Sequence, residues 1–226
     1  MVDTALTSEG LFALHLFCAR LPDANDDAII EIVEQAEAQG VQVVCVAVFG
    51  HKAELCFMIL HEDAWVVRDL QTSLVHAGLQ IVDSYVSLTE LSEYAAGMSK
   101  GMANMRLYPE LPPEGKPAWC FYTMSKRRNP QQNWYELGFE ERQEMMYEHG
   151  ASGRKFTGRV TQLVTGSSGL DDWEWAVTLF GKSMNDLKET VYTMRYDRVS
   201  AAYAEFGGFF AGLSGPVEQI LKRTRP

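Results

Sequence analysis

Cysteine pairs are missing from this 226-residue sequence, and with them the usual signature of a cysteine-based metal site. Cys18, Cys45, Cys56 and Cys120 stand singly inside apolar runs, with no CxxC pair and no histidine at a zinc-ligand spacing. A zinc site built on cysteine is therefore not the expected interpretation. Because free cysteine behaves as a small apolar side chain, we expect four buried, reduced thiols.

Long hydrophobic runs are also absent. No segment approaches about eighteen uncharged apolar residues, the length that indicates a membrane-spanning helix. The opening residues, MVDTALTSEG, lack the basic and apolar regions of a signal peptide. The sequence therefore predicts a soluble, cytoplasmic protein without a membrane span.

Positive charge is in deficit, since 20 Lys and Arg stand against 30 Asp and Glu and give a net charge of −10. A nucleic acid or an anionic membrane surface attracts a positive field, so neither is an expected partner. Basic residues nevertheless gather at 126–128 and around Arg154, Lys155 and Arg159. An anionic small ligand would have to be bound by a local site of this kind.

What the sequence does contain is apolar residues, 46% of the chain, in segments with strand or helix periodicity. A helical stripe runs from Ile29 to Ala36, and Gly40 stands where the glycine that follows a helix belongs. The first half is predicted to follow the order strand, helix, strand, strand, helix, strand. The predicted segments are 11–18, 26–39, 41–49, 54–60, 67–77 and 79–88.

The same order returns in the second half, after a connecting segment rich in glycine and proline. Its predicted segments are 118–126, 139–149, 155–165, 173–180, 185–195 and 200–210, followed by a short helix opened by Pro216. We therefore predict an α+β fold of two ferredoxin-like repeats, with helices outside two antiparallel sheets. The predicted division is an N-terminal repeat at 1–96, a connecting segment at 97–116 and a C-terminal repeat at 117–226.

Two reactive side chains share one face of the strand at 118–126. Because strand side chains alternate, Tyr122 and Lys126 point to the same side as Cys120 and Met124. They could form a redox or acid–base tyrosine with a cation beside it. The more common outcome of such spacing is a half-buried sheet tyrosine and a lysine that reaches solvent, and spacing alone leaves both open.

A histidine closes the helix predicted at 139–149. His149 lies on one helical stripe with Phe139 and Met146, which puts it on the apolar side. It could present a neutral imidazole to a metal. A histidine in the last turn, directly before Gly150, could equally serve to complement the helix dipole.

A single amide interrupts the strand predicted at 155–165. The face that carries Val160 and Val164 is apolar except for Gln162, so we expect a buried amide that needs hydrogen-bond partners. A neighbouring backbone group could supply them. A ligand held between this strand and the helix of His149 could do so too.

Several motifs between Arg106 and Gly212 occur in one order along the chain. They include FYTMSKRRN, NWYELGFEER, MMYEHG, GRVTQLVTGSSGLDDWEWAVTLF, VYTMRYD and YAEFGGFFAG. They strongly resemble the coproheme decarboxylases of the chlorite dismutase-like superfamily. The resemblance implies a dimeric α+β barrel within one chain, assembled as a homopentamer, with iron coproporphyrin III bound by the C-terminal repeat. It also implies transient contact with the ferrochelatase that supplies coproheme.

The activity implied by the resemblance is the oxidation of two propionates of coproheme by hydrogen peroxide, with loss of carbon dioxide, to give heme b. Position by position, Tyr122 matches the radical tyrosine and Lys126 the lysine beside the reacting propionate. His149 matches the proximal iron ligand and Gln162 the polar residue on the opposite side. The remaining expected contacts to the porphyrin are Arg106, Thr123, Met124, Ser125, Arg195 and Ser200.

The sequence departs from the family pattern at Thr123, Gly138 and Gly208, each of which stands where a proline is usual. The loop between Arg106 and Tyr122 is also about two residues longer than the family pattern.

Chlorite dismutase activity relies on an arginine on the side where Gln162 stands, so the glutamine argues against it. A heme peroxidase and a non-catalytic heme-binding or heme-sensing protein remain alternatives.

Overall fold

The first half of the chain forms four strands and two helices in the predicted order. A computed structural model describes residues 6–95 and 97–225; the predicted boundary at residue 96 lies outside them. Asn25 begins the first helix by accepting a hydrogen bond from the Ala28 amide through its side chain. The elements are β1 (Phe12–Arg20), α1 (Asp26–Ala38), β2 (Gln42–Val48), β3 (Leu55–His61), α2 (Ala64–His76) and β4 (Leu79–Thr89).

The second half begins with a short helix and repeats the strand and helix order with additions. The principal elements are α3 (Lys100–Leu107), β5 (Ala118–Lys126), α4 (Phe139–Arg154), β8 (Val160–Gly166), β9 (Trp175–Gly181), α5 (Met184–Met194), β10 (Ala204–Ser214) and α7 (Val217–Arg223). The additions are β6 (Arg128–Asn129), β7 (Gln132–Asn133), the 3-10 helix η1 (Trp134–Glu136) and α6 (Arg198–Tyr203).

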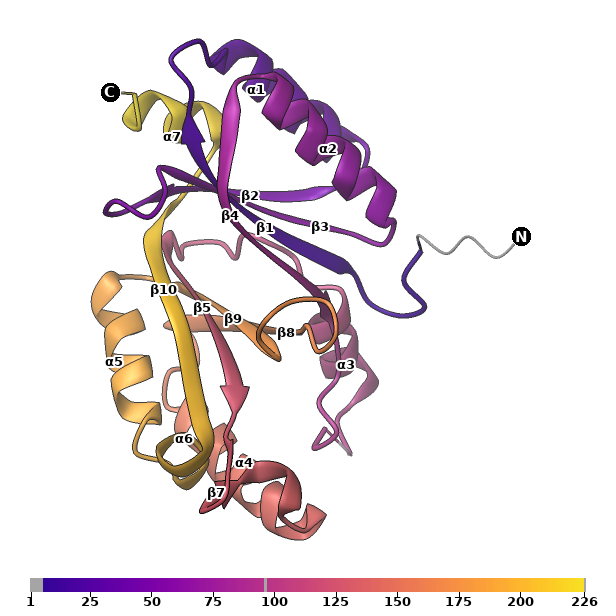
Figure 1. Ribbon diagram of the computed structural model, residues 1–226, viewed down its shortest axis with the longest axis vertical. Coiled ribbons are helices and arrows are strands. Elements are labelled where there is room, and N and C mark those ends of the chain that lie inside the picture. The colour runs from indigo at the N-terminus through magenta and orange to yellow at the C-terminus, as the bar shows by residue number, and fades with distance from the viewer. Residues whose placement is uncertain (1–5, 96, 226) are drawn as a thin grey trace.

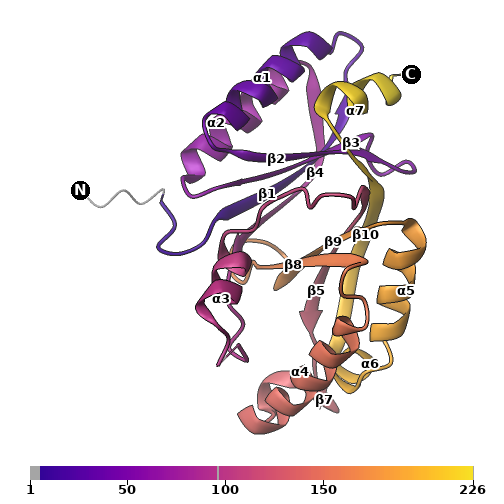
Figure 2. The same cartoon turned by 180° about the vertical axis from the view of Figure 1, so that it is seen from behind.

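The long strands close into one antiparallel barrel, in the order β1-β3-β2-β10-β5-β9-β8-β4. The two halves meet where β10 pairs with β2 and where β4 pairs with β8. In Figures 1 and 2, α1, α2 and α7 cover the sheet of the first half, and α3, α4, α5 and α6 surround that of the second. The prediction of an α+β fold with antiparallel sheets is confirmed.

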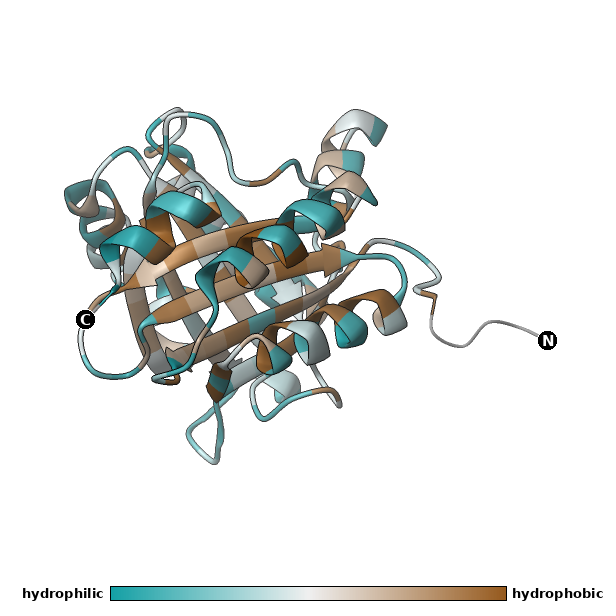
Figure 3. Cartoon of the chain, turned by 90° about the horizontal axis from the view of Figure 1, so that it is seen from above, coloured by the Kyte–Doolittle hydropathy of each residue, from teal (hydrophilic) through white to brown (hydrophobic). Residues whose placement is uncertain are grey.

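Apolar side chains fill the barrel and the spaces under the helices. The barrel interior is rich in aromatic rings, among them Phe17, Trp119 and Phe121. A second cluster lies between the first-half strands and helices α1, α2 and α7, whose polar sides face outward (Figure 3). The four cysteines are free and buried, as predicted. Among the described residues, no helix combines the length and hydropathy needed to cross a membrane.

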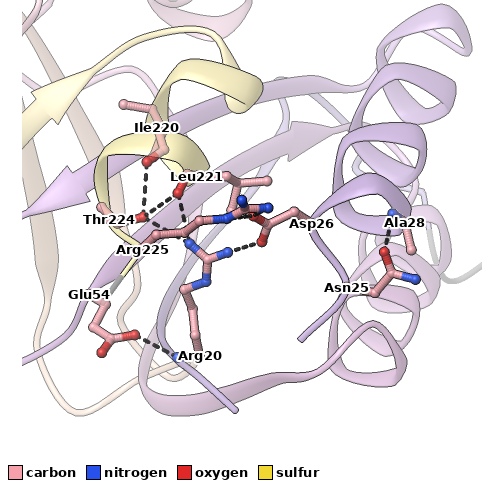
Figure 4. A network of polar contacts seen from close by, with 9 residues as sticks. All are labelled: Arg20, Asn25, Asp26, Ala28, Glu54, Ile220, Leu221, Thr224 and Arg225. Carbon is pink, nitrogen blue, oxygen red and sulfur yellow. Dashed lines mark hydrogen bonds and ion pairs between the residues drawn. The ribbon is translucent and has the colours of Figure 1, made fainter. Parts of the chain in front are cut away.

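The end of the chain returns to the first half and is fastened there by charges. The helix α7 packs on α1 and β2. Arg20 pairs with Asp26 and donates a hydrogen bond to the Leu221 carbonyl, while Arg225 pairs with the same aspartate (Figure 4). The network ties the C-terminal segment to the start of α1.

The largest differences from the predicted segments lie in the second half. The helix predicted to end at residue 149 continues through Gly150 and Gly153 to Arg154, so His149 is not in its last turn. The strand predicted to start at 155 therefore begins at Val160. The sequence predicts a strand from Ser200, but this residue lies in the helix α6, which Asp197 caps.

Candidate functional site

Strand β5 presents Tyr122 on the face of the sheet that points away from the barrel interior. Trp119 and Phe121 belong to the interior cluster, whereas Tyr122 packs with Leu187 of α5 on the outer side. The residue is 8% exposed. Phe209 stacks on the tyrosine ring with centroids 4.6 Å apart, and Phe206 meets it edge-on at 5.7 Å. Burial raises the pKa of Tyr122 above its ordinary value, so the phenol stays protonated near neutral pH.

Lys126 lies at the end of the same strand, on the same face, and is buried despite its charge. Its Nζ stands 4.8 Å from the centre of the Trp134 ring. Burial lowers the pKa of Lys126 to about 8, and the carboxylates of Asp197 and Glu174 oppose this shift. The structure therefore holds an ammonium group in a largely water-excluded place, with two acidic residues nearby.

Glu174 fixes the position of Lys126. Its carboxylate accepts hydrogen bonds from the backbone amide of Lys126 at 2.8 Å and from the Tyr135 hydroxyl at 2.5 Å, and it also pairs with Arg128. Its own amide donates to the Ser125 hydroxyl. Sequence reasoning missed this residue. An acidic side chain between two tryptophans, immediately before an apolar strand, was the available signal.

His149 extends from α4 to a carboxylate at the start of α6. Its Nδ1 lies 2.8 Å from Oδ2 of Asp197, and the hydroxyl of Ser200 lies 3.4 Å from the same nitrogen. The imidazole side chain is 27% exposed, whereas Asp197 is 1% exposed. This arrangement leaves Nε2 as the nitrogen that could bind a metal, with Asp197 orienting the ring as carboxylates do for metal-bound histidines.

Asp197 was not identified from the sequence, although it stands in one of the quoted motifs. Its Oδ1 accepts a hydrogen bond from the amide of Ser200, which caps α6. Burial alone would raise the pKa of Asp197, but the hydrogen bonds from His149 and Ser200 outweigh burial and lower it. The carboxylate is therefore held ionised beside the histidine. The spacing of Asp197 and Ser200 is that of a helix cap and could have indicated α6.

The structure brings the histidine and the lysine into one neighbourhood. Trp134, under the Lys126 ammonium, packs with Met145 of α4 and Val199 of α6. Figure 1 shows α4 and α6 together near the end of β5. One region thus contains an ammonium and an oriented imidazole, and the phenol of Tyr122 lies on the same strand face as the ammonium.

The other predicted site residues lie in differing surroundings. Met124 is half-buried on the face of Tyr122, whereas Thr123 and Ser125 alternate to the opposite face. The guanidinium of Arg195 lies 4.0 Å from the Tyr192 ring centre and 5.0 Å from that of Tyr196. Arg106 is exposed in the last turn of α3.

Gln162 is exposed, and the expectation of a buried amide is wrong. Gln162 of β8 pairs with Leu179 of β9, and its side chain shares with Val164 the face that points away from the barrel. The barrel interior is filled by the alternate residues of this strand, such as Leu163. Gln162 and Val164, with the half-exposed Phe206 and Phe209, border an open apolar face of the second-half sheet.

Comparison with known proteins identifies the family. The family model for chlorite dismutase matches residues 24–214. A coproheme decarboxylase of Staphylococcus carnosus (strain TM300) is 38% identical in an alignment of 247 positions, which covers 97% of this chain and 98% of that protein.

Solved structures agree with this result. A heme-binding protein from Thermus thermophilus superposes with a TM-score of 0.85 at 34% identity, covering 95% of this chain and 94% of its own. A mutant chlorite dismutase from Candidatus Nitrospira defluvii shares the fold, with a TM-score of 0.75 at 16% identity over 98% of each chain. The chain belongs to the chlorite dismutase family.

Proposed function

We propose that this protein is a peroxide-dependent coproheme decarboxylase, which converts two propionates of iron coproporphyrin III to vinyl groups and so gives heme b. The observation that carries the proposal is the placement of Tyr122 and Lys126 on one face of β5, with the Lys126 ammonium near the His149–Asp197 pair. Similarity to the Staphylococcus carnosus coproheme decarboxylase supports the same activity.

The residues present fit an iron porphyrin. His149 would hold the iron through Nε2, since Nδ1 is engaged by Asp197. The half-exposed rings of Phe206 and Phe209, with Val164, offer the apolar surface that a porphyrin face requires. Gln162, which is exposed on the outer face of β8, would be a polar contact to the porphyrin or to its ligand. Arg106, Arg195 and Lys126 would meet the propionates, together with Met124, Ser200 and the backbone around Thr123 and Ser125.

Tyr122 would perform the oxidation. When bound, the iron porphyrin supplies the oxidising power of hydrogen peroxide. Tyr122 loses an electron and its phenolic proton, and then takes a hydrogen atom from the β-carbon of a propionate. Loss of carbon dioxide and one further electron leaves the vinyl group. For each propionate, one carboxylate, one peroxide and one proton give one vinyl group, one carbon dioxide and two water molecules.

Lys126 would compensate the charge of the reacting carboxylate. A buried ammonium forms strong charge-assisted contacts with a carboxylate, because few water molecules compete. As the carboxylate leaves as neutral carbon dioxide, Lys126 can supply the proton that the overall reaction consumes.

The test is to add coproheme and hydrogen peroxide to the purified protein and follow the porphyrin by mass spectrometry. Two successive losses of one carbon dioxide and two hydrogens are expected. An unchanged porphyrin, bound but not converted, would overturn the proposal. A sample with porphyrin but without peroxide is the control.

A second candidate is heme binding without catalysis, which the similarity to the heme-binding protein of Thermus thermophilus favours. In that case Tyr122→Phe would leave every measurable property of the bound porphyrin unchanged. Chlorite dismutase activity and general heme peroxidase activity are two further alternatives. Chlorite dismutase activity would be recognised by the release of oxygen when chlorite is added to the porphyrin-loaded protein.

We infer, further, that the two halves are ferredoxin-like repeats. The support is the strand order β4-β1-β3-β2 in one half and β10-β5-β9-β8 in the other. On this basis residues 1–96 and 117–226 form the repeats and residues 97–116 connect them, with coproheme bound by the second repeat.

By family resemblance we also propose a homopentamer in the cytoplasm that receives coproheme in transient contact with a ferrochelatase.

A further inference from the structure

An irregularity of the barrel lies directly beside Tyr122. In the pairing of β10 with β5, Phe206 stands opposite Met124 and Phe209 stands opposite Tyr122. Three steps along β10 therefore match two along β5, so that Gly207 and Gly208 together face Thr123. This is a β-bulge, a feature that redirects side chains near functional sites.

The bulge puts two rings on the same side of the sheet. In a regular strand, residues three apart point to opposite faces. Here the extra residue lets Phe206 and Phe209 both contact the tyrosine ring, one edge-on and one stacked with an interplanar angle of 21°. Tyr122 is 8% exposed, whereas Phe206 and Phe209 are 42% and 39% exposed. The two phenylalanines thus shield the tyrosine and themselves border the open face.

We infer that Phe209 is a positioning residue for Tyr122, and that the Gly207–Gly208 bulge exists to place it. The inference rests on the proposed function for its consequence. The unpaired electron of a tyrosyl radical occupies orbitals perpendicular to the ring, so hydrogen-atom transfer depends on how the ring plane is turned toward the propionate β-carbon. A ring stacked on one face of Tyr122 restricts rotation of the phenol about its Cβ–Cγ bond. The bulge is therefore part of the oxidation site.

The two glycines of the bulge differ in a way that can be tested. A Cβ added to Gly207 would collide with Oγ1 of Thr123 and would lie 2.9 Å from the Trp173 ring. A Cβ added to Gly208 meets no described atom within 4 Å. Gly207→Ala must therefore displace the bulge, whereas Gly208→Ala leaves it in place.

The decisive measurement is the ring-flip rate of Tyr122, by NMR with labelled tyrosine, in protein without porphyrin. Phe209→Leu removes the stacked ring and keeps apolar volume, and the flip rate should rise about threefold to tenfold, the range that an aromatic pair of this kind supports. Gly207→Ala should change the rate as well. Gly208→Ala should not, and neither should Phe139→Leu, which removes a ring stacked on Tyr94 instead.

An unchanged flip rate in both Phe209→Leu and Gly207→Ala would overturn the inference. A second readout is the electron paramagnetic resonance spectrum of the tyrosyl radical in the coproheme-loaded protein, whose β-proton splitting depends on ring orientation. We expect an altered splitting in Phe209→Leu. If the wild-type protein forms no vinyl product, the proposed function fails, yet the flip rates still decide whether Phe209 fixes the ring.

Discussion

The side chains of Tyr122 and Lys126 lie on one face of β5 but have different surroundings. Tyr122 lies among aromatic rings, where burial keeps the phenol neutral. Lys126 lies against Trp134, with the carboxylates of Asp197 and Glu174 near enough to favour its charged form. A neutral oxidisable group and a cation can therefore coexist on one strand face, which suits the oxidation of an anionic carboxylate.

Replacement of Tyr122 by phenylalanine should abolish vinyl formation while coproheme still binds. Phenylalanine keeps the stacked ring but has no phenolic hydrogen to lose with an electron. The porphyrin mass after peroxide addition measures the outcome. Tyr85→Phe is the matched control, because Tyr85 is also buried but lies in the barrel interior. Normal turnover in Tyr122→Phe would refute the radical role.

The rate of decarboxylation should fall as pH rises through about 8. With its pKa lowered to about 8, Lys126 is mostly charged below that pH and loses the charge above it. In Lys126→Arg the guanidinium stays charged, so the decline near pH 8 should disappear. In Lys126→Met the rate should be low at every pH. A wild-type profile retained by Lys126→Arg would show that another group titrates.

At the scale of elements, α4 and α6 act as a pair. The helix α4 carries His149, and α6 begins at the aspartate that orients it. The same carboxylate therefore caps one helix and fixes a side chain of another. The helix α4 also runs close to the end of α5, since Gly153 lies beside the Met194 side chain.

Substitution of Asp197 should separate its two roles. Asn is as good a helix cap as Asp, so Asp197→Asn should unfold in urea much like the wild type, whereas Asp197→Ala should lose about 1 kcal/mol. A neutral amide is a weaker acceptor for the His149 N–H, so both variants should raise the reduction potential of bound coproheme. Spectroelectrochemical titration measures this shift. An unchanged potential would mean that Asp197 only caps α6.

Over the whole molecule, one closed sheet unites the halves and the C-terminal segment fastens them. The strand β10 pairs with both β5 and β2, and α7 then packs on the first half (Figure 1). The Arg20–Asp26–Arg225 network holds this end of the chain (Figure 4). Its members differ in burial, since Arg20 and Asp26 side chains are 7% and 9% exposed and Arg225 is 66% exposed.

Loss of Asp26 should destabilise the protein far more than loss of Arg225. Asp26→Ala leaves the buried Arg20 guanidinium without its partner, at a cost of about 3–5 kcal/mol. Arg225→Ala removes a solvent-exposed pair, worth about 0–1 kcal/mol. Urea unfolding measures both free energies. Equal losses would show that the exposed arginine, rather than the buried pair, holds the terminus.

Much of the fold followed from periodicity, and the exceptions have physical causes. Strand β5 was predicted and found at 118–126. The predicted helix of His149 stops at residue 149 because Gly150 is a poor helix former. In the structure the helix continues to Arg154, since tertiary packing outweighs a propensity cost of about 1 kcal/mol. Gln162 was expected to be buried because its neighbours are apolar, but apolar neighbours on a strand do not reveal which face a barrel encloses.

Alternation and helical spacing are local properties, so the amino-acid pattern is enough to predict that Tyr122 and Lys126 share a face and that His149 lies on a helix. Three contacts became visible only in the folded chain: Asp197 binds His149, Glu174 holds the Lys126 backbone amide, and Phe209 stacks on Tyr122. These contacts join residues far apart in the chain. They depend on strand order, on the register of β10 against β5 and on one extra residue in a bulge, which no local pattern specifies.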